Sequence, residues 1–131
     1  MKHKHLISMI VTILFLSTGL DSSEEKRIIY VVRSMVTAMN EKDADGYIEH
    51  LNDYFISQTY GSKESIIKNI SKFGHIHLLE LEVSEIKSYY SIVKYRLMYE
   101  DQTNKETFFH GEIILDKTDE GWKIHSISEN S

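Results

Sequence analysis

Apolar residues recur at helical spacing in the first half of the chain. Between residues 24 and 40 they return every three or four positions, at Ile28, Ile29, Val32, Met35, Val36 and Met39. This spacing predicts a long amphipathic helix. Asp43 or Asp45 is expected to cap a second, shorter helix, and Ser62 is expected to begin a third. Residues 54–56 are predicted to form a short strand between the last two helices.

After residue 74 the apolar residues alternate with polar ones, as they do in half-buried strands. The first expected strand has Leu79, Leu81 and Val83 on its apolar face, with a bulge before Ile86. The inward positions of the next two strands are Ser91, Val93, Tyr95, Leu97 and Tyr99, then Phe109, Gly111, Ile113 and Leu115. A last strand begins at Trp122. Three helices followed by an antiparallel meander predict an α+β fold with the helices on one sheet face.

The N-terminus follows neither pattern and is predicted to be an export signal. Two lysines precede an apolar run at residues 6–16, and small residues end the segment at Gly19. The run is shorter than the roughly 20 apolar residues of a comfortable membrane span. We expect cleavage near Gly19, with an uncleaved signal anchor as the alternative. Residues 1–20 would then direct the domain at 21–131 out of the cytoplasm, either secreted or tethered.

Charge and cysteine content narrow the class of partner. The chain has 20 acidic and 15 basic residues, and two of the lysines lie within residues 1–20, so the body is more acidic than the whole. This balance argues against nucleic acid and anionic membranes as partners. Membrane contact is expected only through residues 1–20, and only if they are not cleaved. There is no cysteine, so core packing must hold the domain together without disulfides.

The order and spacing of the elements resemble the nuclear transport factor 2-like superfamily, which includes SnoaL-like and ketosteroid isomerase-like proteins. The resemblance covers residues 24–128 and includes Gly-Ser-Lys-Glu at 61–64 and Gly-Trp-Lys-Ile at 121–124. It implies a cone of order α-α-β-α-β-β-β-β, in which a curved antiparallel sheet wraps three helices around a pocket. It also implies homodimers packed sheet against sheet. Members range from isomerases and dehydratases to non-catalytic ligand binders and assembly factors, so the fold alone does not determine the function.

His75 and His77 are the sharpest local feature of the sequence. If the first strand extends back to them, they share parity with Leu79 and face inward, side by side. Two such histidines can ligate a metal with a third ligand, but His110 and His125 have the opposite parity. We therefore expect no metal and no cofactor. A single inward histidine acting as a general acid or base is the more plausible use.

Aromatic residues offer a second candidate site inside the cone. Tyr95 and Tyr99 are predicted to face inward, and Tyr54, Phe109 and Trp122 could join them around a flat or apolar ligand. The alternative is that these side chains are ordinary core filling. An isomerase-like site would also need an inward carboxylate, and all the expected strand carboxylates point outward, namely Glu80, Glu82, Glu100, Glu112 and Asp116.

The outer sheet face is the predicted dimer surface. Its apolar residues are expected to be Tyr90, Ile92, Met98, Phe108, Ile114 and Ile127.

Two functions remain open. The favoured one is an exported, non-catalytic ligand-binding or accessory and assembly domain, because no catalytic set can be assembled. The alternative is a small cofactor-independent enzyme of SnoaL, dehydratase or isomerase type. It would use His75 or His77 as the acid or base and Tyr95 or Tyr99 as a hydrogen-bond donor.

Overall fold

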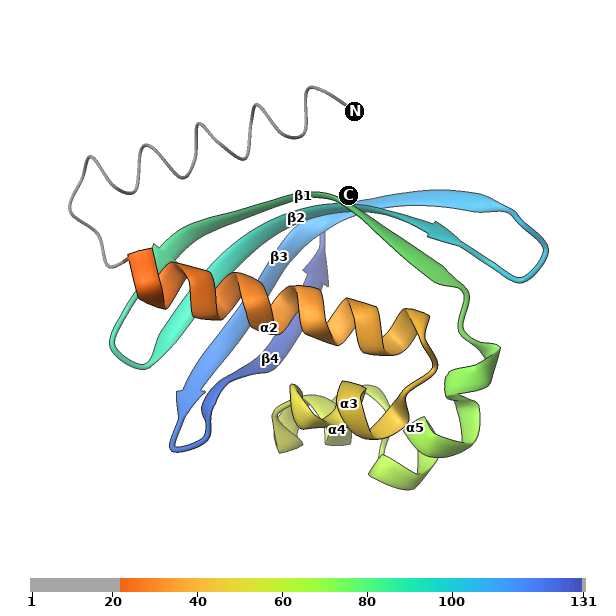
Figure 1. The fold of residues 1–131 in the computed structure, drawn as a ribbon, viewed down its shortest axis with the longest axis horizontal. Helices are drawn as coiled ribbons and strands as arrows, with labels where there is room; N and C mark the ends of the chain where they lie inside the picture. Colours follow the sequence, from red (N-terminus) through yellow and green to blue (C-terminus); the bar gives the residue numbers. More distant parts are fainter. Residues whose placement is uncertain (1–21, 131) are drawn as a thin grey trace.

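The computed structural model describes residues 22–130, which form helices packed on one face of a four-stranded sheet (Figure 1). The helices are α2 (Ser22–Asn40), α3 (Ala44–Glu49), α4 (Asp53–Thr59), α5 (Lys63–Asn69) and the 3₁₀ turn η1 (Ile70–Lys72). The strands are β1 (His75–Ile86), β2 (Tyr90–Glu100), β3 (Glu106–Thr118) and β4 (Gly121–Glu129). All neighbours are antiparallel, in the order β1-β2-β3-β4. The predicted α+β architecture is confirmed.

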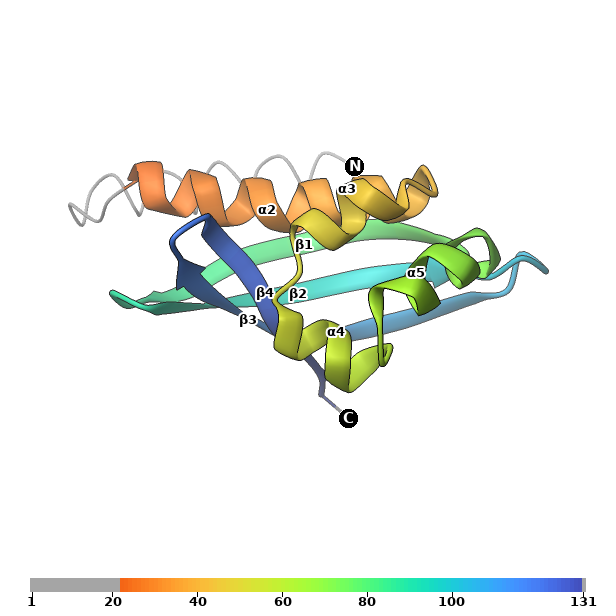
Figure 2. The same cartoon turned by 90° about the horizontal axis from the view of Figure 1, so that it is seen from below.

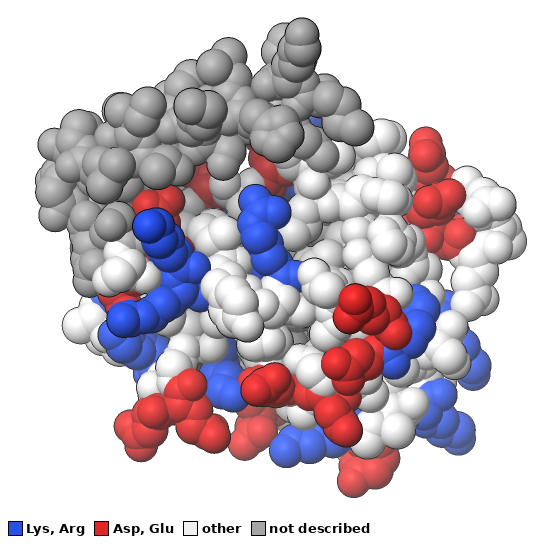
Figure 3. Space-filling model, viewed as in Figure 1, with Lys and Arg blue, Asp and Glu red and all other residues white. Residues whose placement is uncertain are grey.

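The core lies between the helices and the inner face of the curved sheet, along which α2 runs (Figure 2). The inner stripe of α2 includes Ile28 and Val32, which are fully buried, and it packs with Val93, Leu115 and Ile124 of the sheet. The helical repeat of α2 and the two-residue alternation of the strands predict these positions. The helix and the sheet each have one apolar face, and the two faces pack against each other. On the side viewed in Figure 3, acidic and basic side chains are interspersed.

Polar side chains begin the short helices as expected. Asp43 caps α3 by accepting a hydrogen bond from the Gly46 amide (3.0 Å), and Ser62 caps α5 by accepting one from the Ser65 amide (3.2 Å). Within residues 22–130, no helix is both long and apolar enough to cross a membrane. The predicted export segment lies outside the described residues.

The short strand predicted at residues 54–56 is wrong, because this segment belongs to helix α4. Asn52 accepts a hydrogen bond from the Tyr54 amide (2.7 Å) and thereby begins the helix. Phe55 and Ile56 are buried on its inner side. The strand-like contact lies just before the helix, where Leu51 forms an isolated parallel bridge to β4.

Three bulges, two in β1 and one in β4, change which side chains face the core. In β1 the register shifts between Leu78 and Glu80, so Leu79 is the extra residue. The second β1 shift, between Val83 and Glu85, falls where the sequence predicted a bulge. In β4, Ile124 and Ser126 oppose consecutive residues of β3, so His125 is the extra residue. Each bulge reverses the alternation on one side of it.

Three orientations predicted from the sequence are therefore wrong. Ile76 packs against the core, and His75 and His77 consequently face the outer side of the sheet. Ile127 was expected on the outer face, but it pairs with the buried Ile113 and shares its inward side.

Candidate functional site

The inside of the cone holds a small apolar cavity of about 70 Å³. It lies between the C-terminal half of α2 and the middle of the sheet, where Met35, Met39 and Leu97 contribute to its wall. Its remaining lining residues are Val32, Val36, Tyr47, Ile76, Leu78, Tyr95, Ile113 and Ile127. The wall therefore contains no carboxylate and no imidazole, and its polar groups among side chains are the two tyrosine hydroxyls.

Both tyrosine hydroxyls already have partners. Tyr95 Oη donates to the carbonyl oxygen of Ser128 (3.0 Å), and the hydroxyls of Tyr47 and Tyr60 lie 2.7 Å apart. Burial is the main cause that raises the pKa of Tyr47, Tyr60 and Tyr95. These phenols therefore remain protonated near neutral pH and offer no base to a molecule in the cavity.

Tyr95 is the one residue of the predicted aromatic pocket that lines this cavity. Tyr99 Oη instead accepts a hydrogen bond from the Gly74 amide (2.7 Å), which fixes the start of β1. Phe109 packs at the margin of the core, and Trp122 is buried at 4% exposure beneath the start of α2. Tyr54 is 53% exposed, outside the core. The five aromatic residues thus do not form one pocket.

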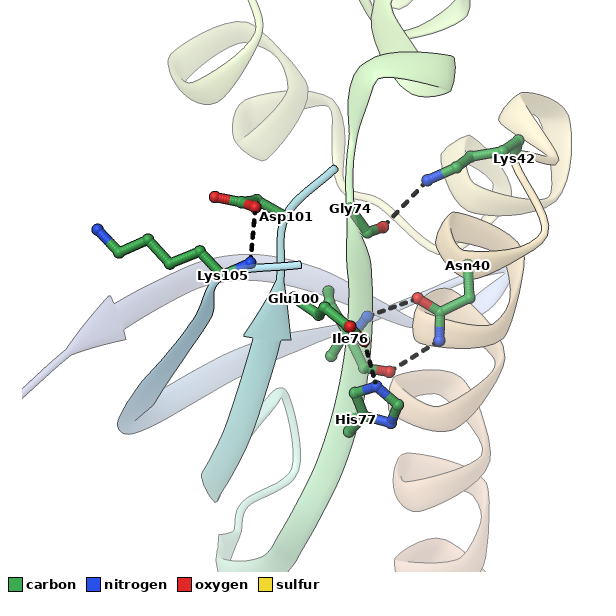
Figure 4. A network of polar contacts seen from close by, with 8 residues as sticks. All are labelled: Asn40, Lys42, Gly74, Ile76, His77, Glu100, Asp101 and Lys105. Carbon is green, nitrogen blue, oxygen red and sulfur yellow. Dashed lines mark hydrogen bonds and ion pairs between the residues drawn. The ribbon is translucent and has the colours of Figure 1, made fainter. Parts of the chain in front are cut away.

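His75 and His77 line an open surface groove of about 540 Å³. Figure 4 shows His77 beside Glu100 at one side of it. Their rings are 4.5 Å apart between centroids, and His77 Nε2 lies 3.5 Å from Glu100 Oε1. Asp101 lines the same groove at the end of β2. Because the histidines are outside the cone, neither can serve a reaction in the cavity with Tyr95.

Asn40 and Lys42 hold the groove together from the end of α2. The Asn40 side chain accepts from the Ile76 amide and donates to the Ile76 carbonyl, both at 2.8 Å, and so pairs with the edge of β1 like a neighbouring strand (Figure 4). Lys42 has a left-handed backbone (φ 61°), and its ammonium donates to the carbonyl oxygens of Phe73 and Gly74. These contacts satisfy backbone groups, which is a structural role.

A second polar cluster, which the sequence did not predict, joins α4 to the outer side of β3 and β4. His125 Nδ1 lies 2.7 Å from Asp116 Oδ2, and Asn52 Nδ2 donates to the same oxygen (3.1 Å). The Tyr54 ring stacks on the His125 ring, with centroids 4.8 Å apart and planes 6° apart. The cluster depends on the β4 bulge and on the α4 cap, and neither is visible as a motif. In the described part of the chain, no three His, Asp or Glu side chains are placed to hold a metal ion.

Comparison with known proteins places this geometry in a known fold. No protein-family model and no curated protein matches the sequence. Among solved structures, an NTF2-like protein of unknown function from Shewanella oneidensis MR-1 matches with a TM-score of 0.58 at 16% identity, over 82% of this chain and 98% of that chain. The fold is NTF2-like.

Other proteins with the NTF2-like fold have different activities. A candidate dehydratase of the NTF2-like family from Streptomyces avermitilis matches with a TM-score of 0.61 at 12% identity, over 81% of this chain and 94% of that chain. The association domain of C. elegans CaMKII also matches with a TM-score of 0.61, at 14% identity, over 84% of this chain and 97% of that chain. At such identities the likeness establishes the fold alone, and the function must be argued from the site.

Proposed function

We propose that this chain is an exported, non-catalytic accessory domain that works by association, first with a second copy of itself. The observation that carries the proposal is the nearly filled cone. Its cavity of about 70 Å³ is far below the roughly 300–1,000 Å³ of ordinary ligand pockets. Its lining offers no acid or base apart from two hydrogen-bonded phenols.

The residues that the enzyme alternative would use do not lie together in the cavity. His75 and His77 lie on the outer side of the sheet, and the Tyr95 hydroxyl is bonded to Ser128. A ligand-binding form of the proposal keeps some support from Met35 and Met39, because methionine side chains adapt their shape and can enlarge an apolar cavity. Native mass spectrometry of the purified full chain checks this form, since a retained small apolar molecule would appear as an added mass.

The outer face of the sheet supports self-association. Two cross-strand apolar pairs, Ile92 with Ile114 and Met98 with Phe108, lie on this side of β2 and β3. Phe108 is 66% exposed, and with Met98 opposite it on β2 it makes this end of the outer face apolar. The fold likeness to an association domain is compatible with self-association.

Sedimentation velocity of the full chain over a range of concentrations tests the dimer. Phe108→Asp is expected to weaken self-association by about tenfold or more, because a charge would replace an exposed apolar side chain that the proposed interface buries. Tyr89→Asp is the matched control, since Tyr89 is 70% exposed but lies in the turn between β1 and β2. A wild-type chain that stays monomeric at both about pH 7.5 and about pH 5.5, or a Phe108→Asp variant that associates as strongly as Tyr89→Asp, would contradict the dimer.

Export is supported by the lysines, apolar run and small residues of the first 20 positions. Cell fractionation with intact-mass measurement tests it. We expect the chain outside the cytoplasm with a mass that corresponds to cleavage near Gly19. Full-length chain found in the cytoplasm would argue against export.

A further inference from the structure

Histidines gather on the outer face of the sheet, the surface that the proposed dimer would bury. His75 and His77 lie on β1, His110 on β3 and His125 at the β4 bulge. All four are exposed or partly exposed. Among the histidines at residues 22–130, only His50 lies elsewhere, at the C-cap of α3.

We propose that protonation of these four histidines switches on self-association, with the outer face of a second copy as the partner. The inference rests on the proposed dimer and adds its regulation. Imidazole side chains ordinarily gain their charge between about pH 8 and pH 5. The association of the chain would then respond to acidification in a range where carboxylates keep their charge.

The other charges on this face explain why it would repel itself at neutral pH. Carboxylates dominate it, at Glu80, Glu82, Glu100, Glu106, Glu112 and Asp116. Glu85 adds a further one and accepts a hydrogen bond from Tyr90 Oη (2.6 Å). The basic groups are Lys94 and Arg96, with Lys123 at the margin. Two such faces have the same sign, so their approach is unfavourable until positive charge is added.

When protonated, the two histidines on β1 would place positive charge beside carboxylates. His75 pairs in register with Glu100, and His77 Nε2 lies 3.5 Å from the same carboxylate. The nearby Asp101 lines their groove, as does Lys42, whose ammonium is bonded to backbone carbonyls. Protonation of the pair therefore offsets the acidic groups at this end of the face.

His110 and His125 extend the effect across β3 and β4. His110 lies opposite Arg96, whose guanidinium donates to Glu80 (2.8 Å), and Glu112 is two residues further along β3. His125 contacts Asp116, which also accepts from Asn52, while the Tyr54 ring stacks on its imidazole. Lys123 is two residues earlier on β4, and its ammonium donates to the Glu49 carbonyl. Each histidine thus has a carboxylate on a neighbouring position.

A second copy fits this surface better than a cationic partner does. The charged rows Lys94–Glu112 and Arg96–His110 lie between the apolar pairs Ile92–Ile114 and Met98–Phe108. In a two-fold packing each contact occurs twice, so apolar pairs can meet apolar pairs while protonated imidazoles meet carboxylates. A cationic partner would instead bind best at neutral pH and weaken on acidification.

Sedimentation velocity of the full chain at about pH 7.5 and about pH 5.5, at one ionic strength, tests the proposal. The association constant is expected to rise about tenfold or more at the lower pH. Added salt is expected to strengthen association at the higher pH, where it screens repulsion, and not at the lower pH. Near-ultraviolet circular dichroism at both pH values checks that the fold is unchanged.

Three histidine variants provide the comparison. The combined variant His75→Gln, His77→Gln, His110→Gln and His125→Gln should lose the rise. His110→Gln alone should lose part of it, and this exposed side chain can be changed without loss of core contacts. His50→Gln is the matched control and should keep the full rise, since His50 lies at the C-cap of α3, away from the outer face of the sheet.

The outcomes separate this inference from the dimer itself. Equal association at both pH values, with Phe108→Asp still disruptive, would overturn the switch and leave the dimer standing. No association at either pH would overturn both, and polylysine binding at about pH 7.5 would then assign the face to a cationic partner. A rise that persists in full in the combined histidine variant would also overturn the switch.

Discussion

At the scale of single residues, the carboxylate of Glu24 joins the start of α2 to the sheet. It accepts from Trp122 Nε1 (3.0 Å), and it pairs with Lys117 (2.9 Å) and Arg27 (2.6 Å). The hydrogen bond from Lys117 is the main cause that lowers the Glu24 pKa below its ordinary 4.5. The side chain is only 13% exposed, so the buried indole depends on it for an acceptor.

Glu24→Gln is expected to lower the free energy of unfolding by about 1 kcal/mol near pH 7. Because the folded-state pKa is lowered, this stability is fully present above about pH 4.5 and is lost as the pH falls through the folded value. The variant and the wild type should therefore converge at low pH in urea unfolding curves. Glu25→Gln is the control, since burial raises the Glu25 pKa and its neutralisation should not destabilise the fold. A pH-independent difference for Glu24→Gln would contradict this account.

Gly111 is required where β4 ends against β3. It pairs with Tyr95 on β2, and a Cβ there would lie 1.9 Å from the carbonyl oxygen of Ser128. Gly111→Ala should push this end of β4 away and cost about 1–3 kcal/mol, because a backbone group cannot yield as a side chain does. Tyr95→Phe removes only the hydroxyl bonded to Ser128 and should cost about 1 kcal/mol. Thermal unfolding measures the stability of both variants. If Gly111→Ala loses less stability than Tyr95→Phe, the backbone of β4 does not approach Gly111 as closely as described.

At the scale of elements, the alternation of β2 and β3 was sufficient to predict their inner faces. Val93, Tyr95, Ile113 and Leu115 are buried as expected, because no bulge interrupts the pairing of these two strands. The helical stripe of α2 was predicted equally well, and with Tyr95 it supplies part of the cavity wall.

The misassigned positions depend on contacts between distant segments. The bulge at Leu79 is set by how β1 pairs with β2, so local sequence could not reveal that His75 and His77 face outward. Three residues at 54–56 are too few for a period to distinguish helix from strand, and the Asn52 cap decides for the helix. The contact between Asp116 and His125 likewise exists only once β3 and β4 are paired.

The junction of α2 and β1 depends on one amide side chain, that of Asn40. Asn40→Ala would leave the Ile76 amide and carbonyl without this partner and should cost about 1–3 kcal/mol. Hydrogen exchange at the Ile76 amide should become faster in the variant. Asn40→Asp is the matched comparison, because it keeps an acceptor for the amide and loses only the donor. Unchanged exchange at Ile76 in Asn40→Ala would show that another group covers this edge.

At the scale of the whole molecule, helices and sheet close almost completely around the cavity. A cone with the NTF2-like fold can hold a substrate only if its interior side chains leave room, and here Met35, Met39 and Leu97 occupy much of that room. The proposed function accordingly uses the outer side of the sheet in place of the cavity. An accessory domain would have an empty cavity, whereas a ligand-binding domain would hold a molecule in it.

A pair of matched valine substitutions measures this property. Val36 lines the cavity, whereas Val93 is fully buried and does not line it. Val36→Ile should raise the free energy of unfolding by about 0.5–1 kcal/mol, because the added methyl group fills empty space. Val93→Ile should lower it by about 1–3 kcal/mol, because the same group must displace packed neighbours. Urea unfolding gives both values. If a bound molecule already fills the cavity, Val36→Ile will destabilise as well, and the added mass in native mass spectrometry should disappear with it.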